Sequence, residues 1–143
     1  MTIDQCDSTS SVVDLIRPLE AKLGAFGALR DFQRTAGDEA QAEFDDTKSL
    51  LDSTLILARQ GTWHIGIGAG QVDEPLPNSA QEGNGVAYRN ARRAIERAKK
   101  SSGNIAYESG THLSCLVEAN LQLVMGLEQE RSESWQMMGE LYS

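Results

Sequence analysis

The spacing of apolar positions changes several times along the chain, and each change predicts a new element. A short apolar stretch at residues 1–4 predicts a first strand, and residues 12–27 repeat apolar side chains at helical spacing. Residues 28–36 alternate as a strand does, Gly37-Asp38 is a tight-turn signal, and residues 40–44 predict the partner strand. The first half of the chain therefore predicts a strand, a helix and a hairpin of two strands.

The second half of the chain predicts two strands and three helices. Asp45 or Asp46 can cap the first of these helices, which ends near Gly61. The remaining elements follow in the order strand, helix, strand, helix, at residues 62–72, 85–101, 104–108 and 111–130.

The order of the first six elements is that of the ferredoxin-like split βαβ plan. We therefore expect an α+β fold in which an antiparallel sheet carries helices on one face, leaves the opposite face open, and is followed by a C-terminal helix. Residues 1–110 are expected to form this domain, and residues 111–143 a helical extension.

The strand predicted at residues 62–72 has two unlike faces. Ile65 and Ile67 point one way, and Gly66 and Gly68 point the other. A face without side chains predicts a close approach, by a helix backbone or by a ligand.

Charge is distributed unevenly along the chain. The net charge is -8, but residues 85–100 carry +5 and the remainder therefore -13. This balance argues against a general nucleic-acid surface, which needs clustered Lys and Arg. A small basic region on an acidic body favours a compact anion instead.

The remaining composition indicates a cytoplasmic protein without a membrane partner. The chain has no apolar run of about 18 residues and no basic head followed by an apolar stretch at residues 1–11. The spacing of Cys6 and Cys115 fits no zinc or redox motif, and both thiols are expected to be reduced, with Cys115 in the core.

Two aspartates can converge in the predicted sheet. Asp4 ends the first strand, Asp38 lies in the hairpin, and the first and third strands are neighbours at the sheet centre. Two aspartates together with substrate phosphates are a usual way of holding Mg²⁺. The basic helix at residues 85–101 could bind the outer phosphates through Arg89, Arg92 and Arg93.

Three stretches of the sequence, AGDEAQAEF, WHIGIGAGQV and GNGVAYRNARRAIERAK, resemble the SatD family. That family in turn resembles the palm of class III nucleotidyl cyclases and GGDEF domains. The resemblance implies that Asp4 and Asp38 are the metal aspartates, that Glu39 is the acidic residue after them, and that Arg92 points at phosphate. It also implies a homodimer, and a DNA-binding helix-turn-helix tail beyond the residues given.

Two departures from the family pattern bear on activity. Ser8 is followed by Thr9 where SatD-like chains usually carry Ser-Arg, and Tyr88 stands where cyclases have an asparagine. We therefore expect a regulatory or nucleotide-binding domain without turnover. The alternative is a Mg²⁺-dependent nucleotidyl cyclase or transferase that uses Asp4 and Asp38.

Simpler interpretations of the same residues stay open. Asp4 and Asp38 are also ordinary turn residues, and the arginine-rich helix face is also typical of a solvated surface. His64 has no metal-ligand partner nearby in sequence and fits a structural strand position.

Overall fold

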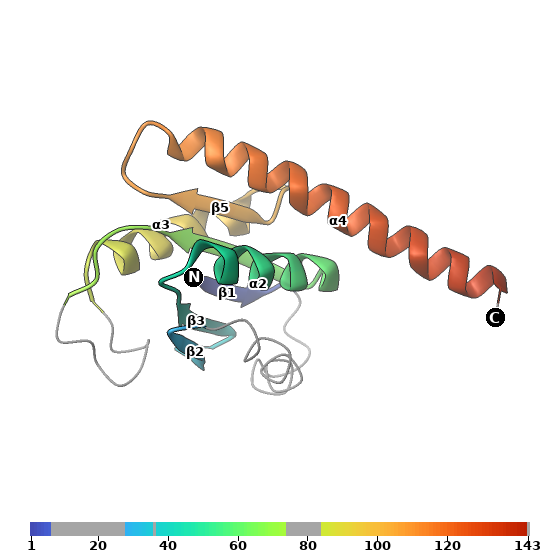
Figure 1. Cartoon of the computed structure of the whole chain (residues 1–143), viewed down its shortest axis with the longest axis horizontal. Coiled ribbons are helices and arrows are strands. Elements are labelled where there is room, and N and C mark those ends of the chain that lie inside the picture. Colours follow the sequence, from blue (N-terminus) through green and yellow to red (C-terminus); the bar gives the residue numbers. More distant parts are fainter. Residues whose placement is uncertain (7–27, 36, 74–83, 143) are drawn as a thin grey trace.

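The computed structural model describes residues 1–6, 28–35, 37–73 and 84–142 (Figure 1). The predicted helix at residues 12–27 lies outside these described residues. In chain order the elements are β1 (Thr2–Gln5), β2 (Arg30–Arg34), β3 (Glu39–Glu43), α2 (Thr47–Gln60), β4 (Trp63–Gly68), α3 (Val86–Lys100), β5 (Ile105–Glu108) and α4 (Ser114–Tyr142).

The described strands form one sheet in the order β2-β3-β1-β4-β5. Strand β1 is central and pairs antiparallel with β3 on one side and with β4 on the other, while β2 pairs antiparallel with β3. Strand β5 pairs parallel with β4 and is reached through helix α3. The expected ferredoxin-like α+β fold is confirmed, and β5 extends its four antiparallel strands to a mixed sheet.

Helix α2 begins and ends at residues that favour those positions. The Asp46 carboxylate accepts hydrogen bonds from the backbone N–H of Ser49 at 3.0 Å and from its hydroxyl at 2.8 Å. Gly61 ends the helix with a left-handed backbone, φ +67°, and its N–H donates to the carbonyl of Ala58 at 3.1 Å. Between these caps the helix buries Leu57 against the sheet.

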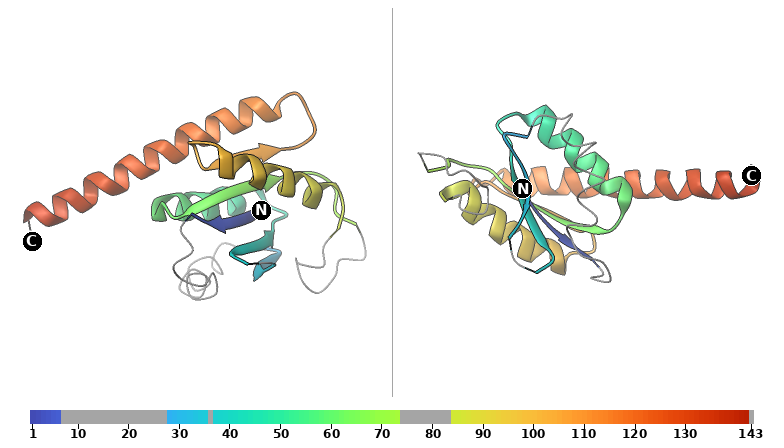
Figure 2. Two further views of the ribbon diagram at one scale, coloured as in Figure 1. Left: turned by 180° about the vertical axis from the view of Figure 1, so that it is seen from behind. Right: turned by 90° about the horizontal axis from the view of Figure 1, so that it is seen from below.

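Neighbouring residues of β4 face opposite sides of the sheet. Ile65 faces the main core, whereas Gly66 and Gly68 face α3. A Cβ atom at Gly66 would overlap the backbone of Ile95, and one at Gly68 would overlap that of Ala91. Helix α3 therefore lies directly on β4 and covers the sheet face that the sequence predicted to be open (Figure 2). Of the two predicted reasons for the glycine face, the structure shows the helix backbone.

Helix α4 extends further than the helix predicted at residues 111–130, and only its first half packs. Leu121 and Met125 contact the main core, and beyond them the helix runs away from the sheet (Figure 1). Arg97 of α3 holds the first turns in place, because its guanidinium lies 2.7 Å from both Glu108 of β5 and Glu118 of α4. No helix in the described part of the chain combines the length and apolarity needed to cross a membrane.

The expectation that Cys115 lies in the core is wrong. Its side chain is exposed, because polar residues occupy the sheet-facing side of this turn. Ser114 is buried and accepts a hydrogen bond from the backbone N–H of Ser109 at 3.0 Å, and Glu118 accepts one from that of Tyr107 at 2.9 Å. These bonds satisfy the edge of β5, which a cysteine cannot do as well.

Candidate functional site

The predicted metal-binding carboxylates lie at one end of the central strands. Asp4 of β1 is the direct cross-strand partner of Glu39 of β3, and His64 of β4 is its partner on the other side. Directly paired residues project from the same face of a sheet, so Glu39, Asp4 and His64 form a row across three strands. The Nδ1 atom of His64 is buried without a hydrogen-bond partner among the described residues.

A lysine outside the predicted set of site residues completes this row. The Lys99 ammonium, in the last turn of α3, lies 3.2 Å from the carboxylate of Asp4 and 3.5 Å from that of Glu96. Burial acts to lower the pKa of Lys99. The hydrogen bond to Asp4 and the charges of Asp4 and Glu39 outweigh burial and raise that pKa above its ordinary value. No spacing in the sequence predicted this contact, because it depends on where the last turn of α3 lies relative to β1.

Asp38 lies next to this row along the chain, in the turn between β2 and β3. Gly37 has the left-handed backbone, φ +57°, that favours glycine in such a turn. Within the part of the chain that the structure describes, no three His, Cys, Asp or Glu side chains are arranged to hold a metal ion. The neighbour of Asp4 in this arrangement is an ammonium group, and magnesium binding stays a prediction.

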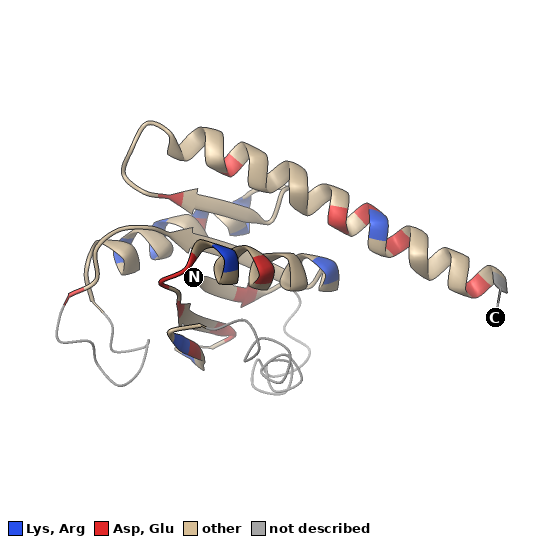
Figure 3. Ribbon diagram, viewed as in Figure 1, with Lys and Arg blue, Asp and Glu red and all other residues tan. Residues whose placement is uncertain are grey.

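The predicted phosphate-binding arginines lie on the solvent side of α3. Arg89, Arg92 and Arg93 are exposed, and none of them takes part in an ion pair between described residues. Basic residues recur along the whole of α3 (Figure 3). The structure therefore places these arginines on one helix, but it does not bring them into a single site with the carboxylate row.

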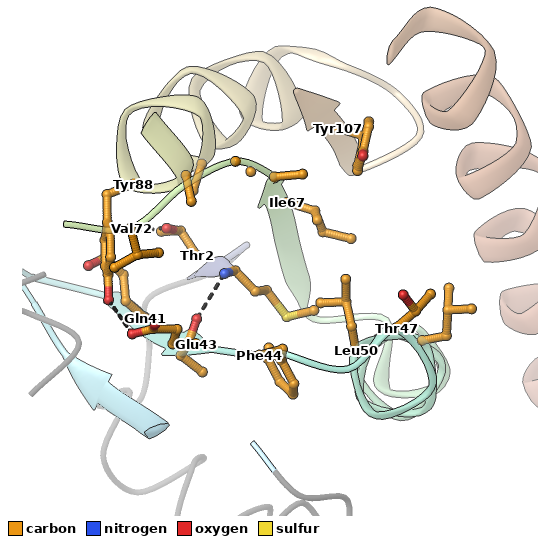
Figure 4. A pocket seen from close by; sticks show the side chains of 18 of the residues that line it. Thr2, Gln41, Glu43, Phe44, Thr47, Leu50, Ile67, Val72, Tyr88 and Tyr107 are labelled. Atoms are coloured by element: carbon orange, nitrogen blue, oxygen red, sulfur yellow. Dashed lines mark hydrogen bonds between the residues drawn. The ribbon is translucent and has the colours of Figure 1, made fainter. Parts of the chain in front are cut away.

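A cavity of about 370 Å³, which no sequence pattern predicted, lies at the opposite end of β1 (Figure 4). All the described elements except β2 contribute to its wall. It lies at the carboxyl ends of the parallel strands β4 and β5, beside the first turns of α3. The volume is within the usual range for small-molecule sites.

Most of the cavity wall is apolar. Phe44 and Leu50 line it on one side, and Ile67 and Tyr107 line it on the other (Figure 4). Two of these four side chains are aromatic, and a third aromatic ring comes from Tyr88 of α3. Such a wall suits a flat, largely apolar group.

Polar groups gather on the side of the cavity formed by β1, β3 and α3. The Gln41 amide donates to the Thr2 hydroxyl at 3.2 Å, which leaves its carbonyl oxygen and a second N–H for other partners. The Tyr88 hydroxyl donates to the Glu43 carboxylate at 2.7 Å, and Arg30 lies 3.2 Å from the same oxygen. No Lys or Arg side chain is found among the described residues that line the cavity.

The Tyr88 hydroxyl is held in its neutral form. Burial raises the pKa of Tyr88 to about 12, with help from its hydrogen bond to Glu43 and from the charge of that carboxylate. At neutral pH this hydroxyl is therefore a fixed donor to Glu43. The Arg30 side chain also hydrogen-bonds to it and acts to lower the pKa of Tyr88, but burial and Glu43 outweigh this effect.

The cavity and the carboxylate row are separate features. Thr2 pairs with Gln41 at the cavity, whereas Asp4 pairs with Glu39, two residues away on each strand. Two residues of a strand span about 7 Å. A ligand bound in the cavity would not necessarily contact the carboxylate row, so binding at the two places has to be tested separately.

Comparisons with known proteins identified no relative of this chain. No protein-family model, no curated protein and no solved structure matches the chain significantly. The resemblance to the SatD family therefore stays a prediction.

Proposed function

We propose that this chain is a regulatory domain whose cavity binds the base of a nucleoside or nucleotide, without turnover. The observation that carries the proposal is the 370 Å³ cavity at the carboxyl ends of β4 and β5. Its aromatic wall offers stacking surface, and Gln41 and Thr2 offer hydrogen-bonding groups to the edge of a flat heterocycle. A base has both a flat face and a polar edge, so it matches the two sides of this cavity.

The lack of basic side chains in the described wall indicates that the base and the phosphates of a nucleotide would bind at different places. Because the described lining contains no Lys or Arg, a phosphate group would bind outside the cavity. The predicted phosphate-binding residues Arg89, Arg92 and Arg93 begin directly after Tyr88, which lines the cavity. We propose that α3 supplies the base contact with Tyr88 and the phosphate contacts with these arginines.

Two observations favour regulation over catalysis. Lys99 neutralises Asp4, at the end of β1 remote from the cavity. In addition, Val117 and Leu121 of α4 line the cavity, so that its occupant would contact the helix that leads away from the domain. The expected DNA-binding tail concerns residues beyond Ser143 and stays a prediction.

The proposal is tested by the melting temperature in the presence of nucleosides and nucleoside triphosphates. A ligand that binds only the folded state raises the melting temperature by mass action. We expect Thr47→Trp to abolish this rise, because Thr47 is exposed but borders the cavity, and the larger side chain would fill part of it. Lys48→Trp is the matched control, since Lys48 is exposed and does not border the cavity. Equal ligand responses of the two variants would contradict the proposed site.

The alternative, a Mg²⁺-dependent nucleotidyl cyclase or transferase, is favoured by the direct pairing of Asp4 with Glu39. It predicts nucleotide binding that depends on Mg²⁺ and is lost in Asp38→Ala. Binding that is independent of Mg²⁺ and unchanged in Asp38→Ala would contradict this alternative. The homodimer implied by the family resemblance belongs to the same untested prediction.

A further inference from the structure

A second cavity, of about 220 Å³, lies between helices α2 and α4 and adjoins the 370 Å³ cavity, which is called the first cavity from here on. Leu51 of α2 and Leu121 of α4 border both cavities and therefore lie between them. The rest of its wall comes from the facing sides of the two helices, at helical spacing: Thr54, Leu55, Ala58, Val124 and Met125.

The wall of the second cavity is apolar. Thr54 has the only polar side chain among the described residues that line it, and its hydroxyl already donates to the carbonyl of Leu50 at 2.7 Å. An ordered water molecule needs two to four polar partners, which this wall does not offer. The second cavity therefore suits neither water nor a charged group.

Contacts on both sides of the second cavity hold the two helices in place. Arg59 of α2 and Glu128 of α4 lie just beyond its wall in the sequence and form an ion pair at 2.8 Å. Nearer the start of α4, Glu118 and Gln122 hydrogen-bond to the backbone of β5. Moving the helices together to close the space would strain these contacts, so the cavity is a built-in feature of the interface.

The size and the position of the second cavity allow a small molecule to enter. An apolar cavity of about 150 Å³ lined by Leu, Ile and Phe stays dry and binds benzene or xenon. The second cavity is larger, and it reaches the surface, because Leu51 and Val124 in its wall are 43% and 41% exposed. An empty apolar space costs stability, since the side chains around it lack contacts on one side. A compact apolar ligand would supply those contacts.

We propose that the second cavity is a binding site for a small, uncharged apolar molecule about the size of one aromatic ring. It is distinct from the site proposed for a nucleoside or nucleotide, because its wall has no polar group left to bind the edge of a base or a phosphate. The proposal therefore does not depend on the function proposed for the first cavity.

Methionine methyl NMR of the full chain, titrated with benzene as the probe, tests the proposal. Met125 lines the second cavity and is 2% exposed, whereas Met137 of the same helix is 64% exposed and lines neither cavity. We expect a saturable shift of the Met125 signal and none of the Met137 signal. The Met125 shift should persist in Thr47→Trp, because Thr47 borders only the first cavity. Absence of a saturable Met125 shift, or its loss in Thr47→Trp, would overturn the proposal.

Variants that fill the second cavity provide the matched comparison. Val124→Phe should fold, because Val124 is 41% exposed, and its larger side chain should occupy part of the space. Ala58→Leu fills the cavity from its buried side, in case the ring of Val124→Phe turns outward. Leu123→Phe is the control, since Leu123 is 63% exposed and lines neither cavity. We expect both filled variants to lose the benzene-induced Met125 shift and the control to keep it. Equal responses of all three variants would overturn the proposal.

Discussion

Glu43 connects three elements, β2, β3 and α3, through its side-chain contacts. Its carboxylate on β3 accepts a hydrogen bond from Tyr88 of α3 at 2.7 Å and lies 3.2 Å from Arg30 of β2. The side chains of Arg30 and Glu43 are each only 10% exposed. A carboxylate this buried needs its partners, because an unpaired buried charge is costly.

Replacing Tyr88 with Phe removes one partner of Glu43. We expect Tyr88→Phe to lower the free energy of unfolding by about 1–2 kcal/mol at pH 7, since Arg30 still pairs with the carboxylate. Urea unfolding measures this loss. Tyr107→Phe is the control, because the Tyr107 hydroxyl makes no hydrogen bond within the described residues. Similar losses in both variants would show that the bond to Glu43 contributes little.

The same hydrogen bond predicts a pH dependence. The folded-state pKa of Tyr88 is raised from 10.0 to about 12, so the fold favours the neutral phenol. Its contribution is fully present below pH 10 and is lost as the pH rises through 12. The stability difference between wild type and Tyr88→Phe should therefore be constant from pH 7 to 9 and shrink above pH 10. A difference that grows over that range would contradict the assigned hydrogen bond.

Lys99 is the second residue that fastens α3 to the sheet. We expect Lys99→Met to lower the free energy of unfolding by about 0.5–1 kcal/mol through loss of its contact with Asp4. Because the pKa of Lys99 is raised, this contribution is present below about pH 10.5 and is lost at higher pH. Lys100→Met, at the exposed neighbouring position, should change stability by less than about 0.5 kcal/mol. If Asp4 instead needs a metal ion, Lys99→Met should gain stability on addition of Mg²⁺, whereas the present account predicts no gain.

At the scale of elements, the contact between α3 and β4 determines how the second half of the chain is arranged. Gly66 and Gly68 let the helix backbone approach the strand directly, and the small side chains of Ala91 and Ala94 keep the contact close. This contact places Tyr88 at the cavity and Lys99 at Asp4, since both residues lie on the same helix. The position of both candidate sites therefore depends on two glycines.

We expect Gly68→Ala to destabilise the fold by about 2–3 kcal/mol, because the new methyl group would overlap the backbone of Ala91. Gly126→Ala is the matched control on α4, where a Cβ atom meets nothing within 4 Å. It should raise stability by about 0.5–1 kcal/mol through helix propensity. Thermal unfolding of the two variants gives the comparison, and a neutral Gly68→Ala would mean that α3 does not lie on β4 as described.

Local sequence patterns predicted most of the described helices and strands, because the spacing and capping signals of an element come from residues close together in the chain. The alternation around Ile65 and the cap at Asp46 are signals of this kind, and both correspond to observed elements. The order of strands predicted that Asp4 and Asp38 converge, and the observed cross-strand partner of Asp4 is Glu39, the residue after Asp38. Cys115 was misplaced because helical spacing alone does not reveal that the polar residues Ser114 and Glu118 occupy the sheet-facing side of this turn.

At the scale of the whole molecule, the cavity brings together residues from almost the full length of the chain. Thr2 and Leu121 border the same space although 119 positions separate them. No local spacing relates such residues, so no sequence pattern predicted the cavity. The sites that were predicted are those that short motifs indicate. Motifs predicted the arginines of α3 and the carboxylates of β1 and β3. Only the structure shows that these two groups lie apart.

Isothermal titration calorimetry of the full chain with nucleosides and nucleoside triphosphates tests the central claim most directly. The account predicts one ligand bound per chain, with an affinity that is independent of Mg²⁺, present in Lys48→Trp and lost in Thr47→Trp. The triphosphate should bind more tightly than its nucleoside, and less so at high salt, because its phosphates meet the arginines of α3. Absence of binding by every nucleoside and nucleotide, or binding that requires Mg²⁺ and disappears in Asp38→Ala, would contradict it.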